Sequence, residues 1–128
     1  MLKKPNAAPR ERGAAAVEFA LIAPLLVLLV LGSIEFGWFF FTQANVANAA
    51  REGAREIAIS NNLSKARTTA VNAANPTTVK LSDVVILPTS CSPGINAKVT
   101  ITVVYDALTG MFGQNFTATG TGVMRCGG

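Results

Sequence analysis

Two acidic residues, Glu18 and Glu35, lie inside a long apolar segment of the sequence. The segment runs from Ala14 to Phe41 without a lysine or an arginine, and it exceeds the roughly 20 residues that a helix needs to cross the hydrocarbon core of a membrane. A carboxylate in hydrocarbon costs several kcal/mol unless it is paired, protonated or close to water. Each of these acids therefore requires a specific partner or position.

The residues in front of Glu18 match a processing site of the prepilin type. A basic leader ends in Gly13, an apolar helix follows it, and Glu18 is the fifth residue counted from Ala14. This pattern predicts that a prepilin-type peptidase cleaves between Gly13 and Ala14 and removes residues 1–13.

Two alternatives compete with this prediction. Cleavage by signal peptidase near "VLGS" would release a secreted protein, although Glu18 interrupts the start of the apolar region and no A-x-A pattern follows it. The other alternative is a signal anchor that is never cleaved. Its product keeps the whole leader.

Glu35 lies near the far end of the apolar segment. At 100° per residue its side chain is about a quarter-turn round the helix from Glu18, so that one partner cannot easily serve both acids. Its carboxyl group can extend outward to water, stay protonated or pair with another membrane subunit, and the sequence leaves these three open. Ser33 and Gly37 beside it form a small-xxx-small pair, which permits close helix packing.

The charges around the apolar segment predict its orientation. Four basic residues precede it, namely Lys3, Lys4, Arg10 and Arg12. The first basic residue after it is Arg51, so the positive-inside rule puts the N-terminus in the cytoplasm and the following domain outside. The aromatic residues 38–41 suit the outer interface, and about 30 Å of helix places Glu18 at the inner one.

The apolar helix is predicted to continue beyond the membrane over residues 42–60, because small and apolar residues recur at spacings of three and four up to about Ser60. Asn61 and Asn62 end it, and Ser64 is the predicted cap of a second helix that ends near Ala74. The extension carries a charged strip, which is either a docking surface for a partner or a solvated face: Arg51, Glu52, Arg55 and Glu56.

Residues 61–128 are predicted to form a small domain with a sheet of about three antiparallel strands, packed on the helix. The β-rich segments are Val79–Leu87, Ala97–Tyr105 and Phe116–Arg125. The predicted fold class is α+β, with a long N-terminal transmembrane helix and a short second helix. Between the last two strands lies an apolar tip, which we expect to pack in the core or, alternatively, to contact a partner or the membrane: Leu108, Met111 and Phe112.

The chain has two cysteines, Cys91 and Cys126. An even pair in an oxidising compartment predicts a disulfide bond. It would tie the end of the last strand to the loop before its neighbour.

The composition argues against catalysis, metal binding and nucleic-acid binding. The 128 residues include no histidine, which excludes histidine acid–base catalysis, and an ordinary four-ligand zinc site lacks ligands. The net charge of +4 is not gathered into a DNA-binding stripe. A membrane-tethered hydrolase is the alternative from another class, but its candidate residues lack the spacing of known catalytic motifs: Asp83 with Asp106, or Ser64 with Lys65. We expect no enzyme activity, no metal and no cofactor.

The sequence resembles the TadE-like family, which comprises minor pilin-like proteins of the tight-adherence pilus system. The resemblance rests on "RGAAAVEFAL" at the front, Pro24, "IEFG" at Ile34–Gly37 and "NAAREGAR" at Asn48–Arg55, and it extends to the closing strands. It implies a pilin-like domain organisation with four parts: a cleaved leader, 1–13; a transmembrane helix, 14–41; its extracytoplasmic continuation, 42–60; and a small α+β domain, 61–128.

The resemblance also implies a role. The chain would be a prepilin-peptidase substrate that stays in the bacterial inner membrane or enters an adhesive pilus as a minor subunit. Its partners would be the peptidase, other pilin-like subunits and the pilus assembly proteins of the inner membrane. After cleavage, Glu18 can neutralise the Ala14 ammonium of a neighbouring subunit. The alternative is an uncleaved single-pass scaffold of a secretion or pilus machine.

Overall fold

The computed structural model describes residues 9–127, with side chains from Arg12 onward. Residues 1–8 of the predicted leader, with Lys3 and Lys4, and the last residue of the predicted domain lie outside the described residues. The chain forms two compact units, Met1–Ile34 and Glu35–Gly128. Seven residues of the predicted span, 35–41, thus belong to the second unit.

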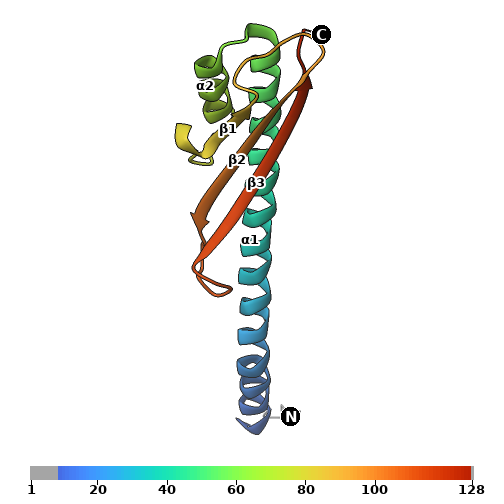
Figure 1. The fold of residues 1–128 in the computed structure, drawn as a ribbon. Coiled ribbons are helices and arrows are strands. Elements are labelled where there is room, and N and C mark those ends of the chain that lie inside the picture. The colour runs from blue at the N-terminus through green and yellow to red at the C-terminus, as the bar shows by residue number, and fades with distance from the viewer. Residues whose placement is uncertain (1–8, 128) are drawn as a thin grey trace, which may run out of the picture. The chain divides into compact units, whose positions relative to one another are not determined.

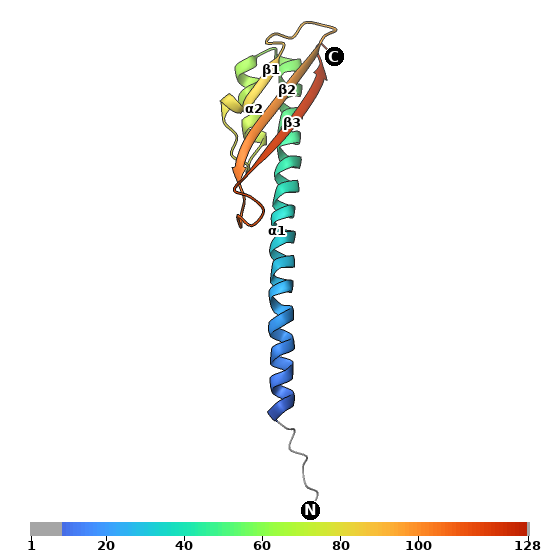
Figure 2. The ribbon, with the colours of Figure 1, turned by 60° about the horizontal axis from the view of Figure 1, so that its bottom comes forward.

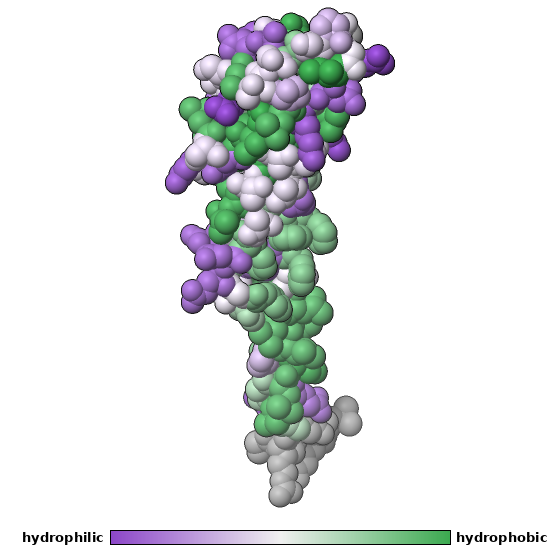
Figure 3. Space-filling model, viewed as in Figure 1, coloured by the Kyte–Doolittle hydropathy of each residue, from purple (hydrophilic) through white to green (hydrophobic). Residues whose placement is uncertain are grey.

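The first unit contains the N-terminal part of helix α1, which runs from Pro9 to Ser60 and contains Pro24. Most of its leucines and valines are exposed, for example Leu25 at 66% and Leu29 at 63%. The surface of this part is accordingly hydrophobic (Figure 3). By length and composition α1 is able to cross a membrane, and its most apolar window is not buried within the protein.

The second unit is an α+β head, as predicted. It contains the rest of α1, α2 (Leu63–Ala73), a 3-10 turn (Leu81–Asp83), β1 (Val84–Leu87), β2 (Asn96–Asp106) and β3 (Asn115–Arg125). The strands form one antiparallel sheet in the order β1-β2-β3. Helix α2 and the C-terminal part of α1 cover one face of this sheet (Figures 1 and 2).

Small residues allow β3 to lie directly against the α1 backbone. Gly120 and Gly122 alternate with exposed threonines, and a Cβ atom at either glycine would collide with main-chain atoms of Val46 or Ala50. Inward-facing side chains of β2 and residues of α1 complete the core: Val99, Ile101 and Val103 with Ala49, Ala54 and Ile57. The helix and the sheet are therefore packed at backbone contact distance.

Gln43 of α1 closes part of the free edge of β3. Its Nε2 donates to the carbonyl oxygen of Thr119 at 2.7 Å, and the N–H of Thr119 donates back to Oε1 at 3.3 Å. The side-chain amide therefore satisfies both backbone polar groups of one edge residue.

Two local predictions were wrong. The N-cap of α2 is Asn62, whose Oδ1 accepts from the N–H of Lys65 at 3.0 Å, whereas Ser64 lies inside the helix. The first strand begins at Val84 rather than Val79, because Asp83 Oδ2 accepts from the N–H of Lys80 at 2.9 Å and closes a 3-10 turn. In both cases a side chain bonds the backbone locally, which competes with regular structure.

Cys91 and Cys126 form the predicted disulfide, with their Cα atoms 5.5 Å apart. The backbone around them is also bonded, since the N–H of Cys126 donates to the carbonyl oxygen of Ile95 at 2.8 Å. The N–H of Cys91 donates to Oδ1 of Asn61 at 2.6 Å. These contacts join the end of β3, the loop before β2 and the end of α1.

Candidate functional site

Glu35 binds the loop between β2 and β3, which comprises residues 107–114. Its carboxylate accepts from the N–H of Leu108 at 2.9 Å and from the N–H and the hydroxyl of Thr109, both at 2.8 Å. The side chain is only 3% exposed. We call this set of contacts the Glu35 clasp.

The loop is shaped so that its amides reach Glu35. It is closed at its base, where the N–H of Ala107 donates to the carbonyl oxygen of Gln114 at 3.2 Å. Gly110 and Gly113 have φ values of 68° and 130°, in the left-handed region that glycine adopts without strain. The chain can therefore turn tightly and point two successive N–H groups at one carboxylate.

Aromatic residues surround the clasp. The rings of Phe36 and Phe112 are 5.7 Å apart, and those of Phe39 and Phe116 are 5.8 Å apart. Together with Glu35 they line a small apolar cavity of about 120 Å³.

The apolar tip of the loop is not part of the core. Leu108 and Phe112 are each 54% exposed and Met111 is 44% exposed. The expectation of core packing for these residues was therefore wrong, since about half of each side chain is open.

The sequence predicts three alternative roles for Glu35, and none of them is a bond within its own chain. The partners that it missed, Leu108 and Thr109, lie more than 70 residues away and act mainly through backbone N–H groups. Backbone donors leave no signal in residue type. The one available hint was an acid in an apolar segment together with a glycine-containing loop.

Tyr105 lies at the end of β2 near the clasp. Burial raises the pKa of its phenol above the ordinary value, and the negative charge of Glu35 raises that pKa further. The neutral phenol is thus the form that the fold favours.

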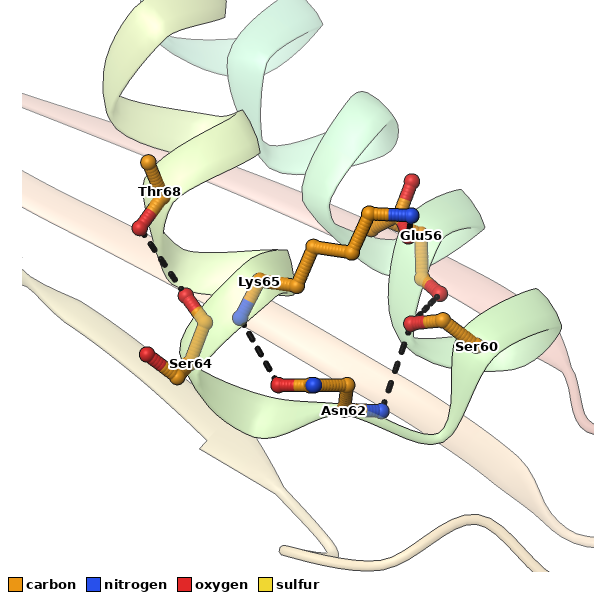
Figure 4. A network of polar contacts seen from close by, with 6 residues as sticks. All are labelled: Glu56, Ser60, Asn62, Ser64, Lys65 and Thr68. Carbon is orange, nitrogen blue, oxygen red and sulfur yellow. Dashed lines mark hydrogen bonds and ion pairs between the residues drawn. The ribbon is translucent and has the colours of Figure 1, made fainter.

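The charged strip is partly occupied within the head. Glu56 forms an ion pair with Lys65 of α2 at 2.8 Å, in a polar network at the turn between α1 and α2 (Figure 4). The hydrogen bond from Lys65 lowers the pKa of Glu56 below its usual value. Arg51 and Arg55 are exposed, whereas Glu52 and Glu56 are half-buried, so the most exposed side chains of the strip are basic.

The processing residues lie in the first unit. Gly13, Ala14 and Glu18 are helical and exposed.

The small-xxx-small pair of Ser33 and Gly37 lies further along α1. The hydroxyl of Ser33 donates to the carbonyl oxygen of Leu29 at 2.8 Å, and nothing would lie within 4 Å of a Cβ atom at Gly37. The surface at both small residues is therefore open to another helix.

Asp83 and Asp106 line one groove of about 570 Å³, which also involves Trp38 and Thr42. Each carboxylate is already bonded within the fold. Asp83 accepts from the N–H of Lys80, and Asp106 accepts from the side-chain NH2 group of Asn115. Within residues 9–127 no three histidine, cysteine or acidic side chains are grouped to hold a metal ion.

The fold defines a class of protein in which a helix able to span a membrane continues into a small, disulfide-bonded α+β head. Within that class, residues 13–55 match the family model described as TadE-like protein. The match confirms the predicted resemblance over this segment, which runs from Gly13 through Glu18 and Glu35 to Arg55. Neither curated proteins nor solved structures gave a match.

Proposed function

We propose that this chain is a pilin-like minor subunit that takes part in assembly of a tight-adherence pilus. The observation that carries the proposal is the TadE-like match, which starts at Gly13 and contains an exposed apolar helix with an acid at its front. The chain would lie in the bacterial inner membrane with its N-terminus in the cytoplasm and its head outside, as its basic leader indicates.

Glu18 gives the proposal a physical basis. Cleavage after Gly13 creates an ammonium group at Ala14, and an exposed carboxylate on a neighbouring helix can neutralise it where water is scarce. Because each helix carries one group of each sign, the pairing would fix the axial offset between subunits. The partners are then pilin-like subunits, the peptidase and membrane assembly proteins, and the role is structural rather than catalytic.

A second candidate is an uncleaved single-pass scaffold of a secretion or pilus machine. One observation favours it: α1 begins at Pro9, so the bond between Gly13 and Ala14 lies inside a helix in the intact chain. Proteases generally bind extended segments, so the helix around this bond would have to unwind before cleavage.

The intact mass of the protein separates the two candidates. We expect that co-expression with a prepilin-type peptidase yields a chain that begins at Ala14. Gly13→Leu should keep the leader, whereas the matched control Gly37→Ala, at an open position of the same helix, should be cleaved normally. A leader retained on the wild-type chain in the presence of active peptidase would favour the scaffold.

A further inference from the structure

We propose that the loop of residues 107–114 inserts into the outer interface of the lipid bilayer, held there by the Glu35 clasp. This inference rests on the proposed membrane anchoring by α1. The new element is that the head itself contacts the lipid surface through this loop.

The exposed surface around the clasp is apolar on both the helix and the loop. On α1, Phe36 is 56% and Phe40 is 65% exposed, and on the loop Leu108 and Phe112 are 54% exposed. The sequence carries no charged residue between Asp106 and Arg125. Exposed aromatic and aliphatic side chains without charge are typical of the membrane–water interface.

The position of the clasp on α1 identifies the partner as lipid. Glu35 and Phe36 belong to the predicted span, residues 14–41, and three hydrogen bonds hold the loop to Glu35. The ring of Phe112 also lies 5.7 Å from that of Phe36. A loop fixed to Glu35 and Phe36 must share their level in the bilayer, together with the exposed rings of Phe36 and Phe40.

The clasp also satisfies two backbone N–H groups of the loop. Backbone N–H groups that leave water must be satisfied by the protein, and Glu35 accepts from those of Leu108 and Thr109. The same bonds satisfy the carboxylate, which is 3% exposed. The exposed polar residues Gln114 and Asn115 follow the apolar ones, as expected where the chain returns to water.

Tryptophan fluorescence tests the insertion on the full-length protein. The chain has one tryptophan, Trp38, so Trp38→Phe provides a background in which Met111→Trp or Phe112→Trp places a single probe on the loop. Val123→Trp in the same background is the matched control, since Val123 is also 54% exposed but lies on β3. Each protein is reconstituted into phosphatidylcholine vesicles whose acyl chains are brominated near the headgroup or near the terminal methyl, and disulfide formation checks the fold.

We expect lipid brominated near the headgroup to reduce emission from both loop probes at least as strongly as emission from wild-type Trp38, with little loss for the control probe. Quenching of Trp38 without quenching of the loop probes would overturn the insertion while leaving the membrane anchor intact, and would place the tip in water or against another protein. If Trp38 too were unquenched, the anchoring itself would fail, and the inference with it.

Discussion

The carboxylate of Glu35 bonds α1 to the loop of residues 107–114, and its charge also acts on Tyr105, the single tyrosine of the chain. Burial and the Glu35 carboxylate both raise the pKa of Tyr105. The stability contributed by the neutral phenol is present below about pH 10, the ordinary pKa, and is lost as pH rises through the higher folded pKa. The head should therefore lose stability in this alkaline range.

Glu35→Gln should lower the pKa of Tyr105 toward its ordinary value, because the amide is similar in size but carries no charge. Ultraviolet absorbance of the phenolate measures this titration directly, since Tyr105 is the only tyrosine. The matched control is Glu52→Gln on the same helix, which should leave the titration unchanged. An unchanged titration in Glu35→Gln would contradict the effect of the Glu35 charge on Tyr105.

Glu18 is the residue at which processing and assembly can be separated. If it neutralises the Ala14 ammonium of a neighbour, Glu18→Gln should leave cleavage after Gly13 intact and should reduce crosslinking to pilin partners nearly as much as Glu18→Ala. Glutamine keeps the size and polarity but cannot neutralise a charge. Wild-type crosslinking in Glu18→Gln would show that hydrogen bonding or helix packing suffices, and a retained leader would indicate a role in peptidase recognition.

At the scale of elements, the contact between β3 and α1 depends on the absence of side chains. Gly122→Ala should force the strand away from the Ala50 backbone and lower the free energy of unfolding by about 1–3 kcal/mol, the usual range for overpacking. Thr121→Ala, at the exposed position beside it, is the control and should change stability little. Urea unfolding of the oxidised protein measures both, and a wild-type midpoint for Gly122→Ala would disprove the tight packing.

The whole head is tied together by the disulfide between Cys91 and Cys126, which are 35 residues apart. A crosslink that closes a loop of this length stabilises a protein by about 3–4 kcal/mol. Replacing both cysteines with serine should therefore lower the free energy of unfolding by a similar amount, which urea unfolding measures. Alkylation of the denatured, non-reduced wild type should find no free thiol, and labelling at either cysteine would contradict an oxidised head.

Periodicity predicted the main elements well, because apolar spacing reports which face of an element is buried. It placed the end of α1 at Ser60 and the second and third strands within a residue or two of their ends. The cap of α2 was harder to predict, because asparagine and serine are both good caps. Asn62 has the extended backbone of an N-cap, whereas Ser64 is already helical.

The sequence identified Glu35 as a candidate site residue but did not predict its contacts with Leu108 and Thr109. The sequence singled out Glu35 because an acid in an apolar segment is costly. It could not supply the partner, because two of the three donors are backbone N–H groups brought close by the hairpin of β2 and β3. The pairing of Glu56 with Lys65 was missed for a similar reason, since it depends on how α2 folds back on α1.

The bond between Gln43 and Thr119 has a consequence for assembly. An edge strand offers unpaired N–H and C=O groups that can recruit a strand from another molecule and so start a continuous intermolecular sheet. The side-chain amide of Gln43 presents one donor and one acceptor, as a peptide group does, and occupies both groups of Thr119. Two copies of this chain are thereby impeded from joining edge to edge at this point of β3.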